Sequence, residues 1–282
     1  GTFHHLANRM LRRHAGRIGW PQDYSILDED DSRSIVREAI RDLGLKDKLF
    51  PSPEILLSVL GLAVNRDVSP AELVQQRFAH TDADAEAVLR VLEEYAARKR
   101  ALRAMDFDDL LVNGRRLLQE CPLVLQDYQE RFLYALVDEY QDTNPIQASL
   151  VDLLSARHRN LLVVGDDFQS IYSWRGADYR HFLSFPERYP DAHVFKLETN
   201  YRSLPGILNV ANECIAGNPN QFQKTLRAVR TAPDRPRLVD VQDGRQQAHY
   251  VAEEIARWVG AGVQPREIAV LYRSHFHALE AQ

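Results

Sequence analysis

The N-terminal part of the chain carries hydrophobic residues at helical spacing. In residues 3–14 (FHHLANRMLRRH) the apolar side chains recur on one face, which predicts an amphipathic helix. Residues 16–21 (GRIGWP) follow directly and should end it, because glycine and proline interrupt helices. Residues 30–104 repeat the helical spacing without strand-like alternation. We therefore expect a helical subdomain over residues 21–104.

Start signals divide this block into separate helices. Asp31 or Ser32 is expected to cap the first helix, and Pro53 opens the second. The third begins at residues 69–72 (SPAE), which combine a capping serine, a proline at the first helical position and an acid three residues after the cap. The fourth runs through residues 87–102.

From about residue 105 the pattern changes to short apolar runs separated by helical stretches. The runs predicted to be strands are residues 132–137, 161–164 and 193–197. Such alternation indicates a parallel α/β sheet. Each run ends in polar residues, at 138–139, 165–167 and 198–200. Because ligands bind beyond the carboxyl ends of parallel strands, we expect these residues to line a ligand site.

The C-terminal part of the chain predicts the opening of a second α/β unit. A helix at 205–215 precedes a loop at 217–236 that is rich in Asn and Pro. Two further strands are expected at 237–241 and 268–272, around a helix at 246–259. The chain shows no internal repeat and no low-complexity tract.

Composition narrows the functional classes. The chain has 282 residues, 45% hydrophobic and 27% charged, which is ordinary globular material. No run approaches the roughly 18–20 apolar residues of a membrane span, and the first residues lack the features of a secretory signal. They also lack Met and do not look like a natural N-terminus. Cys121 and Cys214 form no disulfide framework, so a cytoplasmic location fits best.

Charge and histidine content add two further limits. The net charge is −5, whereas proteins that hold nucleic acid by bulk charge are usually basic. Any DNA contact must therefore be a local track of donors and stacking rings. The ten histidines have no cysteine or acid arranged to complete a zinc set. The basic residues at 98–100 and Arg103 are read as a solvated helix face rather than a phosphate site.

The strongest chemical signal is the octet at residues 137–144 (VDEYQDTN). An apolar strand there delivers Asp138 and Glu139 to the edge of a crevice. Nucleotide hydrolysis needs one acid to hold Mg²⁺ and a second to orient and deprotonate water. An acidic turn after a strand is the alternative, but Gln141 and Asn144 in the same octet favour the chemistry.

Two further motifs follow strand-like runs. Residues 165–177 (GDDFQSIYSWRGA) place Tyr172 and Trp174 near a cation, which suits stacking on unpaired bases; alternatively both rings are core residues. In residues 200–203 (NYRS), Arg202 can reach phosphate oxygens with its planar fork, and Tyr201 can stack on a base. A surface salt bridge and a packed tyrosine are the alternative there.

These three motifs, in this order, resemble the UvrD/Rep/PcrA family of superfamily 1 DNA helicases. Family-like segments also occur at residues 2–4 (TFH), 106–110 (DFDDL) and 268–273 (IAVLYR). The resemblance implies an α/β fold, with a RecA-like parallel-sheet motor domain, a helical insertion and the start of a second RecA-like domain. The predicted ranges are 1–20 and 105–195 for the first motor domain, 21–104 for the insertion, and 196–282 for the second domain.

The resemblance also implies a role for each matching residue. Asp138 would hold Mg²⁺, and Glu139 would be the general base for the attacking water. Gln169 would couple nucleotide state to domain movement, and Arg202 would reach the γ-phosphate. These four are the predicted catalytic residues.

The predicted binding residues follow in the same way. Tyr201 would stack on adenine, while Gln141, a second coupling glutamine, and Asp166 complete the nucleotide-binding set. The predicted DNA-binding residues are Thr2, Phe3, His4, Tyr172, Trp174 and Arg175. The cofactors implied are ATP and Mg²⁺, and the implied partners are single-stranded DNA and junctions of single- and double-stranded DNA. Movement would run from 3′ to 5′, in a role such as DNA repair.

The sequence departs from the family in two places. Phe168 stands where the family usually has a second acid. No Gly-Lys dipeptide occurs anywhere, so the chain has no phosphate-cradling Walker A loop. In the family that loop would precede Gly1, and the last motifs would follow Gln282. We therefore expect little ATP hydrolysis by this section alone, and a non-catalytic DNA-binding or regulatory fragment and the motor part of a helicase–nuclease subunit stay open as alternatives.

Overall fold

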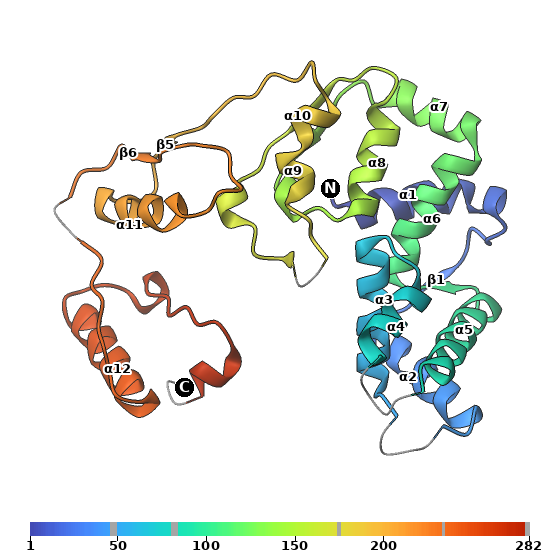
Figure 1. Cartoon of the computed structure of the whole chain (residues 1–282), viewed down its shortest axis with the longest axis horizontal. Coiled ribbons are helices and arrows are strands. Elements are labelled where there is room, and N and C mark those ends of the chain that lie inside the picture. Colours follow the sequence, from blue (N-terminus) through green and yellow to red (C-terminus); the bar gives the residue numbers. More distant parts are fainter. Residues whose placement is uncertain (46–49, 80–83, 174–175, 233–234, 280–282) are drawn as a thin grey trace. The chain divides into compact units, whose positions relative to one another are not determined.

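The computed structural model describes residues 1–45, 50–79, 84–173, 176–232 and 235–279. By its internal contacts the chain divides into two units (Figure 1). Unit 1 comprises residues 1–196 and 218–224, and unit 2 comprises residues 197–217 and 225–282. The domain ranges expected from the sequence stay a prediction.

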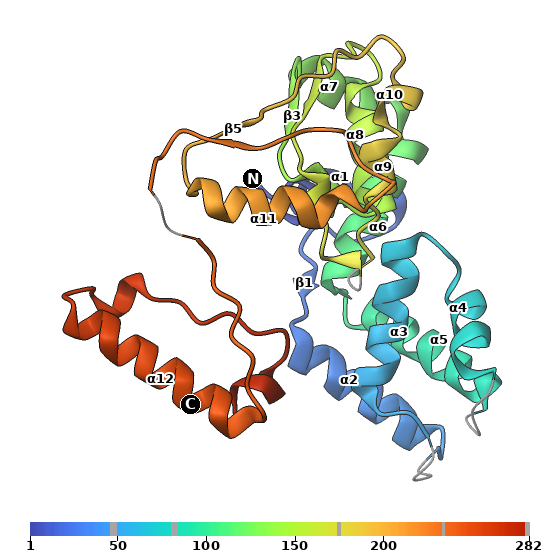
Figure 2. The same ribbon diagram turned by 60° about the vertical axis from the view of Figure 1, so that its left-hand side comes forward.

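A core of long helices opens unit 1. α1 (Phe3–His14) lies beside α6 (Phe107–Glu120), as Figures 1 and 2 show. α7 (Pro122–Arg131) and α8 (Pro145–Ser155) pack on the same core. The apolar face predicted for residues 3–14 supplies its buried residues, and the prediction of this helix is confirmed. The fully buried side chains here include Met10, Leu11, Leu117, Leu118 and Leu150.

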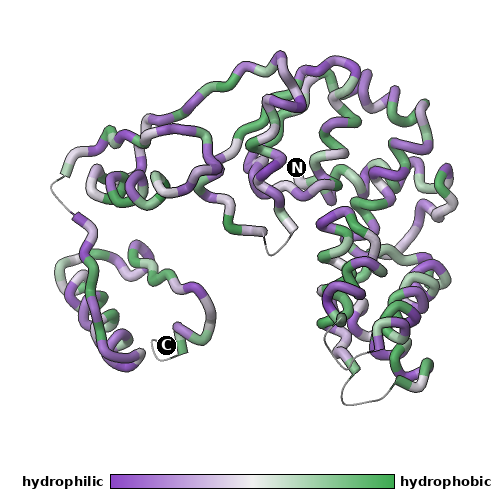
Figure 3. The backbone as a smooth tube through the Cα atoms, in the orientation of Figure 1, coloured by the Kyte–Doolittle hydropathy of each residue, from purple (hydrophilic) through white to green (hydrophobic). Residues whose placement is uncertain are grey.

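A second core belongs to the helical block. α2 (Glu29–Asp42), α3 (Pro53–Arg66), α4 (Pro70–Phe78) and α5 (Ala85–Ala101) pack around it, which confirms the predicted series of helices. Apolar and polar residues mix along each helix, as Figure 3 shows. The core side chains include Val36, Leu56, Val59, Val88 and Tyr95.

The predicted cap of α2 was wrong. Asp28 is the N-cap, and its side chain accepts from the N–H of Asp31 at 2.8 Å. Asp31 is the partner of the capping box, returning a hydrogen bond to the N–H of Asp28, and Ser32 is buried. Asp28 and Asp31 satisfy each other's backbone N–H groups, which sets the helix start three residues before the predicted cap.

Two short parallel strands stand at the ends of the helical block. β1 (Ser25–Ile26) pairs with β2 (Ala104–Met105), in the register Ser25 to Ala104. The sequence did not predict them, because a strand of two residues is too short to show alternation.

The parallel α/β fold predicted from the sequence is confirmed. β3 (Ala135–Val137) pairs in parallel with β4 (Leu161–Val163), and α8 connects them. Their register aligns Ala135 with Leu161 and Val137 with Val163. α9 (Arg180–Leu183) and α10 (Phe185–Arg188) follow, and the Phe185 side chain packs in one cluster with Tyr140 and Ala148. Paired parallel strands with helices between them set the carboxyl ends of β3 and β4 side by side.

Unit 2 contains β5 (Thr199–Asn200), α11 (Pro205–Ala216), β6 (Arg227–Ala228) and α12 (Gly244–Gly260). β5 and β6 pair in parallel. The helices predicted at 205–215 and 246–259 are confirmed. None of the helices described in either unit is long and apolar enough to cross a membrane.

Three predicted strands were wrong. Residues 193–197, 237–241 and 268–272 are not strands in the described structure. Their apolar side chains, such as Phe195 and Leu271, are largely exposed. An apolar run becomes a strand only when another strand supplies its backbone hydrogen bonds, and among the described residues these runs form no ladder. The pairing strand lies just beyond the first run, at β5.

Candidate functional site

The acidic pair stands at the end of β3. Asp138 and Glu139 follow Val137 directly, and both side chains are exposed. Glu139 has φ 51° and ψ 42°, a left-handed conformation that non-glycine residues rarely adopt. This sharp turn lets the next residue, Tyr140, become fully buried while Glu139 stays exposed. Strained backbone of this kind is found at functional sites, although Asp67, Arg103 and Arg159 share it outside this one.

Gln141 joins the ends of the two strands. Its side chain is buried, with 1% of the residue exposed. The Nε2 group donates to Oε2 of Glu139 at 2.7 Å, and Oε1 accepts from the N–H of Asp166 at 3.0 Å. The Gln141 side chain therefore links the Glu139 carboxylate, after β3, to the backbone of Asp166, after β4.

The glycine after β4 is required by this contact. A Cβ at Gly165 would lie 2.7 Å from Oε1 of Gln141 and 3.0 Å from a ring carbon of Phe182. Neither distance is tolerated without displacement of the neighbour. Gly165 thus allows the two loops to approach closely enough for the Gln141 bridge.

The loop after β4 adds a second pair of polar groups. Oδ2 of Asp166 accepts from Nε2 of Gln169 at 2.7 Å, and its Oδ1 accepts from the N–H of Phe168 at 3.1 Å. Burial alone would raise the pKa of Asp166, but hydrogen bonds from Lys224 and Gln169 outweigh it and hold that pKa below its usual value. The structure therefore brings Glu139, Gln141, Asp166 and Gln169 into one hydrogen-bonded network, with Asp138 adjacent.

Asp142, next to Gln141 in the sequence, is close enough to Glu139 to feel its charge. Its Oδ1 is buried and has no hydrogen-bond partner among the described residues. Burial raises the pKa of Asp142, and the nearby carboxylate of Glu139 raises it further. The acidic motif is thus electrostatically coupled as well as hydrogen-bonded.

The predicted residues Tyr201 and Arg202 lie in unit 2, directly after β5. Oδ1 of Asn200 accepts from the N–H groups of Arg202 at 3.0 Å and Ser203 at 2.7 Å, which fixes the turn. Tyr201 is 74% exposed, which contradicts a packed tyrosine within this unit and leaves its ring face available. That Arg202 meets the carboxylates of unit 1 stays a prediction.

The N-terminal DNA-binding candidates are only partly available. Thr2 caps α1, where its Oγ1 accepts from the N–H of His5 at 3.2 Å. Phe3 packs against the first core. His4 lies edge-on to the ring of Phe107 at 5.9 Å, and burial lowers its pKa. Of these three, Thr2 is the exposed one.

The aromatic loop is anchored at its far end. Tyr172 is exposed, whereas Trp174 and Arg175 lie outside the described residues. Gly176 has φ 83°, and a Cβ there would lie 2.4 Å from Cβ of Asn65 at the end of α3. The Asn65 side chain also accepts from Nδ2 of Asn144 at 2.7 Å. One residue of the helical block therefore contacts both the acidic motif and the aromatic loop.

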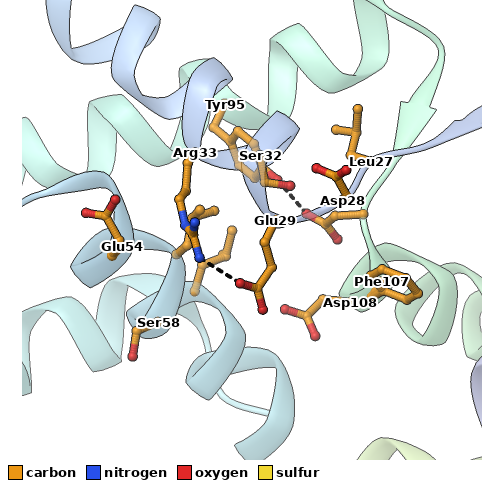
Figure 4. Close-up of a pocket in the computed structure, with 13 residues that line it drawn as sticks. Leu27, Asp28, Glu29, Ser32, Arg33, Glu54, Ser58, Tyr95, Phe107 and Asp108 are labelled. Carbon is orange, nitrogen blue, oxygen red and sulfur yellow. Dashed lines mark hydrogen bonds and ion pairs between the residues drawn. The ribbon is translucent and has the colours of Figure 1, made fainter.

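One cavity in the described structure is separate from this network. It has a volume of about 370 Å³ and lies between the start of α2, α3 and the start of α6 (Figure 4). Carboxylates of Glu29 and Asp108 point into it, and Arg33 pairs with Glu29 at 2.7 Å. Its charges are largely acidic, which does not suit nucleotide phosphates.

Behind the cavity lies a buried ion cluster that the sequence analysis missed. Nζ of Lys99 is 2.5 Å from Asp106 and 2.6 Å from Asp109, and the hydroxyl of Tyr95 donates to Asp106 at 2.8 Å. We call these four residues the Lys99 cluster. The prediction that Lys99 belongs to a solvated helix face was wrong, because that side chain is buried between α5 and α6. No periodic pattern marks it; only the acids of DFDDL, 7 and 10 positions after Lys99, hint at a partner.

Lys224 is the second residue that the sequence did not indicate. It comes from the polar loop after α11, and its Nζ pairs with Asp166 at 2.6 Å and Asp167 at 2.8 Å. The one available signal was Phe168, whose departure from the family pattern marks this loop as unusual.

Comparison with known proteins gives consistent matches along the chain. Residues 1–190 match the family described as UvrD/REP helicase N-terminal domain, and residues 195–280 match the UvrD-like helicase C-terminal domain. The chain is 37% identical over 274 residues to proteins named ATP-dependent DNA helicase PcrA from Staphylococcus aureus (strain NCTC 8325 / PS 47) and from Staphylococcus epidermidis (strain ATCC 12228 / FDA PCI 1200). These alignments cover 97% of this chain and 37% of each relative, so the chain spans little more than a third of their length.

Proposed function

This chain belongs to the UvrD/Rep-like DNA helicase family, and we propose that it is a section of an ATP-dependent helicase or translocase. In this proposal Mg-ATP hydrolysis is coupled to 3′-to-5′ movement on single-stranded DNA, with single-strand/double-strand junctions as substrates and the cytoplasm as location. The observation that carries the proposal is the network of Glu139, Gln141, Asp166 and Gln169 at the ends of two paired parallel strands.

In the proposal, Asp138 and the residues of this network each have a distinct chemical role. Asp138 is exposed at the strand end and, together with phosphate oxygens and water, suits Mg²⁺, which needs only one or two protein carboxylates. When bound, that ion supplies neutralisation of the phosphate charge. Glu139 accepts the proton of the attacking water, and Gln141 fixes its orientation through the 2.7 Å hydrogen bond. Gln169 senses the nucleotide from the neighbouring loop.

The binding surfaces in the proposal come from both units. Arg202 stabilises the γ-phosphate and Tyr201 stacks on adenine from the turn after β5. Tyr172 with Trp174 and Arg175 forms the platform for unpaired bases, and the N-terminal segment at 2–4 adds a DNA contact. The exposed ring of Tyr201 supports its role, because an exposed aromatic face is what base stacking requires.

The test replaces Glu139 with Gln in a longer polypeptide that joins this chain to a phosphate loop of the family type. Glutamine can still accept the hydrogen bond from Gln141 but cannot take a proton. We expect the kcat of DNA-stimulated ATP hydrolysis to fall by about 100-fold or more. Binding of a fluorescent ATP analogue should be retained.

The matched control is Glu187→Gln, an exposed acid of α10 in the same unit, which should leave hydrolysis unchanged. Undiminished turnover in Glu139→Gln would remove the general base from the proposal.

A second candidate function follows from the sequence. Because no Gly-Lys dipeptide occurs in the 282 residues, the chain by itself is a candidate for a non-catalytic DNA-binding or regulatory segment. Binding of a fluorescent oligothymidine without ATP hydrolysis by this chain, and also by the polypeptide with the phosphate loop, would favour that reading over the motor.

A further inference from the structure

A short segment departs from its sequence neighbours. Residues 218–224 pack with unit 1, whereas the residues before and after them belong to unit 2. The N–H of Phe222 donates to Oδ2 of Asp167 at 2.9 Å, and its ring lies edge-on to Phe182 at 5.3 Å. Nζ of Lys196 donates to the carbonyl of Gln223 at 2.5 Å. The segment is therefore fastened to the acidic loop after β4.

Lys224 ends this segment and contacts each of three consecutive loop residues. Its Nζ lies 2.6 Å from Oδ1 of Asp166 and 2.8 Å from Oδ1 of Asp167. It also lies 4.0 Å from the centre of the Phe168 ring, a cation–π distance. The Lys224 side chain is 11% exposed, and that of Asp167 is 2% exposed. We call these four residues the Lys224 cluster.

The contacts give a physical reason for the aromatic residue in this loop. Two adjacent carboxylates repel each other, and one of them is almost fully buried, so the loop needs a cation. Phe168 presents its negative ring face to that cation without adding a third anion. Burial would lower the pKa of Lys224, but the hydrogen bonds and charges of both aspartates outweigh it and raise that pKa. The ammonium therefore stays charged where the loop requires it.

The same ammonium reaches the proposed hydrolysis site through Asp166. One oxygen of this carboxylate accepts from Lys224 at 2.6 Å, and the other accepts from Gln169 at 2.7 Å. Both oxygens are thus fixed, and so is the direction in which Gln169 points. Without the ammonium, Oδ1 of Asp166 would lose its charged hydrogen-bond donor, so the carboxylate could turn toward solvent and Gln169 would lose its acceptor.

We propose that Lys224 is a positioning residue for nucleotide hydrolysis: it holds Asp166 in the orientation that directs Gln169 toward the nucleotide. This inference rests on the proposed function, because it assigns Lys224 to the same site. Lys224 itself contacts neither nucleotide nor DNA in this proposal.

The test compares Lys224→Met, Asp167→Asn and the double variant, in the longer polypeptide that contains a phosphate loop. Methionine keeps the apolar stem and removes the charge. Lys224→Met should lower the melting temperature by about 5–10 °C, because it leaves a buried carboxylate unpaired. It should also lower the kcat of DNA-stimulated ATP hydrolysis by about tenfold, with the KM for ATP changed by less than about twofold.

The double variant separates positioning from stability. Asparagine at 167 removes the buried charge and can still accept from the N–H of Phe222, so the melting temperature should return to that of Asp167→Asn. The kcat should stay about tenfold below that of Asp167→Asn, because Asp166 still lacks its cation. Recovery of kcat together with stability would overturn the proposal, as would full activity of Lys224→Met. Absence of hydrolysis in the unaltered polypeptide would instead contradict the proposed function.

Discussion

The Lys99 cluster and the Lys224 cluster use the same chemistry in different surroundings. In each, one ammonium lies within 2.8 Å of two carboxylates and close to an aromatic ring. In the Lys99 cluster the carboxylates also form the capping box of α6, so their acceptors are used within the cluster. In the Lys224 cluster, Asp166 also accepts a hydrogen bond from Gln169, whose side chain is exposed.

In our proposal this difference separates a structural ion pair, the Lys99 cluster, from one that positions a residue of a site, the Lys224 cluster. A buried lysine between acids is by itself no sign of function, because holding two helices together is a sufficient reason for it. An ion cluster can act on a binding site only when it is hydrogen-bonded to an exposed side chain that reaches that site. The predictions below concern the Lys99 cluster, the contact at Gly176 and the acid beside the Lys99 cluster, from the largest expected effect to the smallest.

The largest effect is expected for Lys99→Met. Removing the ammonium leaves the largely buried carboxylates of Asp106 and Asp109, 14% and 23% exposed, without a cation, so the free energy of unfolding should fall by about 3–5 kcal/mol. Chemical denaturation monitored by circular dichroism measures it. Arg116→Met, which removes an exposed pair with Glu120 on the same helix, should cost less than about 1 kcal/mol. Equal losses in the two variants would mean that the Lys99 cluster is not a structural centre.

A smaller loss is expected for Gly176→Ala, where the helical block meets the aromatic loop. Alanine there must adopt φ 83° and clash with Cβ of Asn65, which together should cost about 2–4 kcal/mol. Gly19→Ala is the matched control, since Gly19 has φ 80° but nothing within 4 Å of a Cβ. Its cost should be about 1–2 kcal/mol, from backbone strain alone. Indistinguishable unfolding curves for the two variants would exclude the Asn65 contact.

The smallest effect concerns Asp108, which lines the cavity beside the Lys99 cluster. Burial raises the pKa of Asp108 to about 6, and the carboxylate of Asp106 adds to this, against the opposing charge of Lys99. The folded protein therefore holds this proton more tightly than the unfolded chain does. The stability that the proton contributes is present at low pH and is lost as the pH rises from about 4 to about 6.

Asp108→Asn removes this dependence. The variant should gain about 1–2 kcal/mol over the unaltered protein at pH 7, and much less at pH 4. The gain is limited by the partial exposure of the Asp108 side chain and by the favourable position of its negative charge in the first turn of α6. Urea denaturation at both pH values measures the difference. The same gain at both would show that Asp108 titrates normally.

Several features of this protein followed from the sequence because their causes are local. The helix at 3–14 and the helices of the block at 30–104 arise from apolar spacing and from caps such as Ser69. The acidic motif at 137–144 stands at the end of an apolar run, and a strand end is where the structure has it. Motif order alone also identified the family, which the comparisons confirmed.

Local patterns failed where a second segment decides the outcome. Residues 193–197 and 237–241 were predicted to be strands, and they are not strands in the structure. A strand needs a second strand as its hydrogen-bond partner, and the sequence around one run does not show where that partner lies. β5 and β6, of two residues each, gave no periodic signal. They nevertheless pair in parallel, although a helix and a loop separate them in the sequence.

The amino-acid sequence by itself determined which chemical groups the chain can offer, since carboxylate, amide and aromatic groups keep their character wherever they lie. Only the tertiary structure decided which of them touch: Lys224 meets Asp166 across 58 positions, and Asn65 meets Asn144 across 79. Coulomb attraction and steric fit depend on distance in space, and the path of the folded chain sets that distance. A lysine in an unremarked polar loop could therefore become the cation of an acidic site.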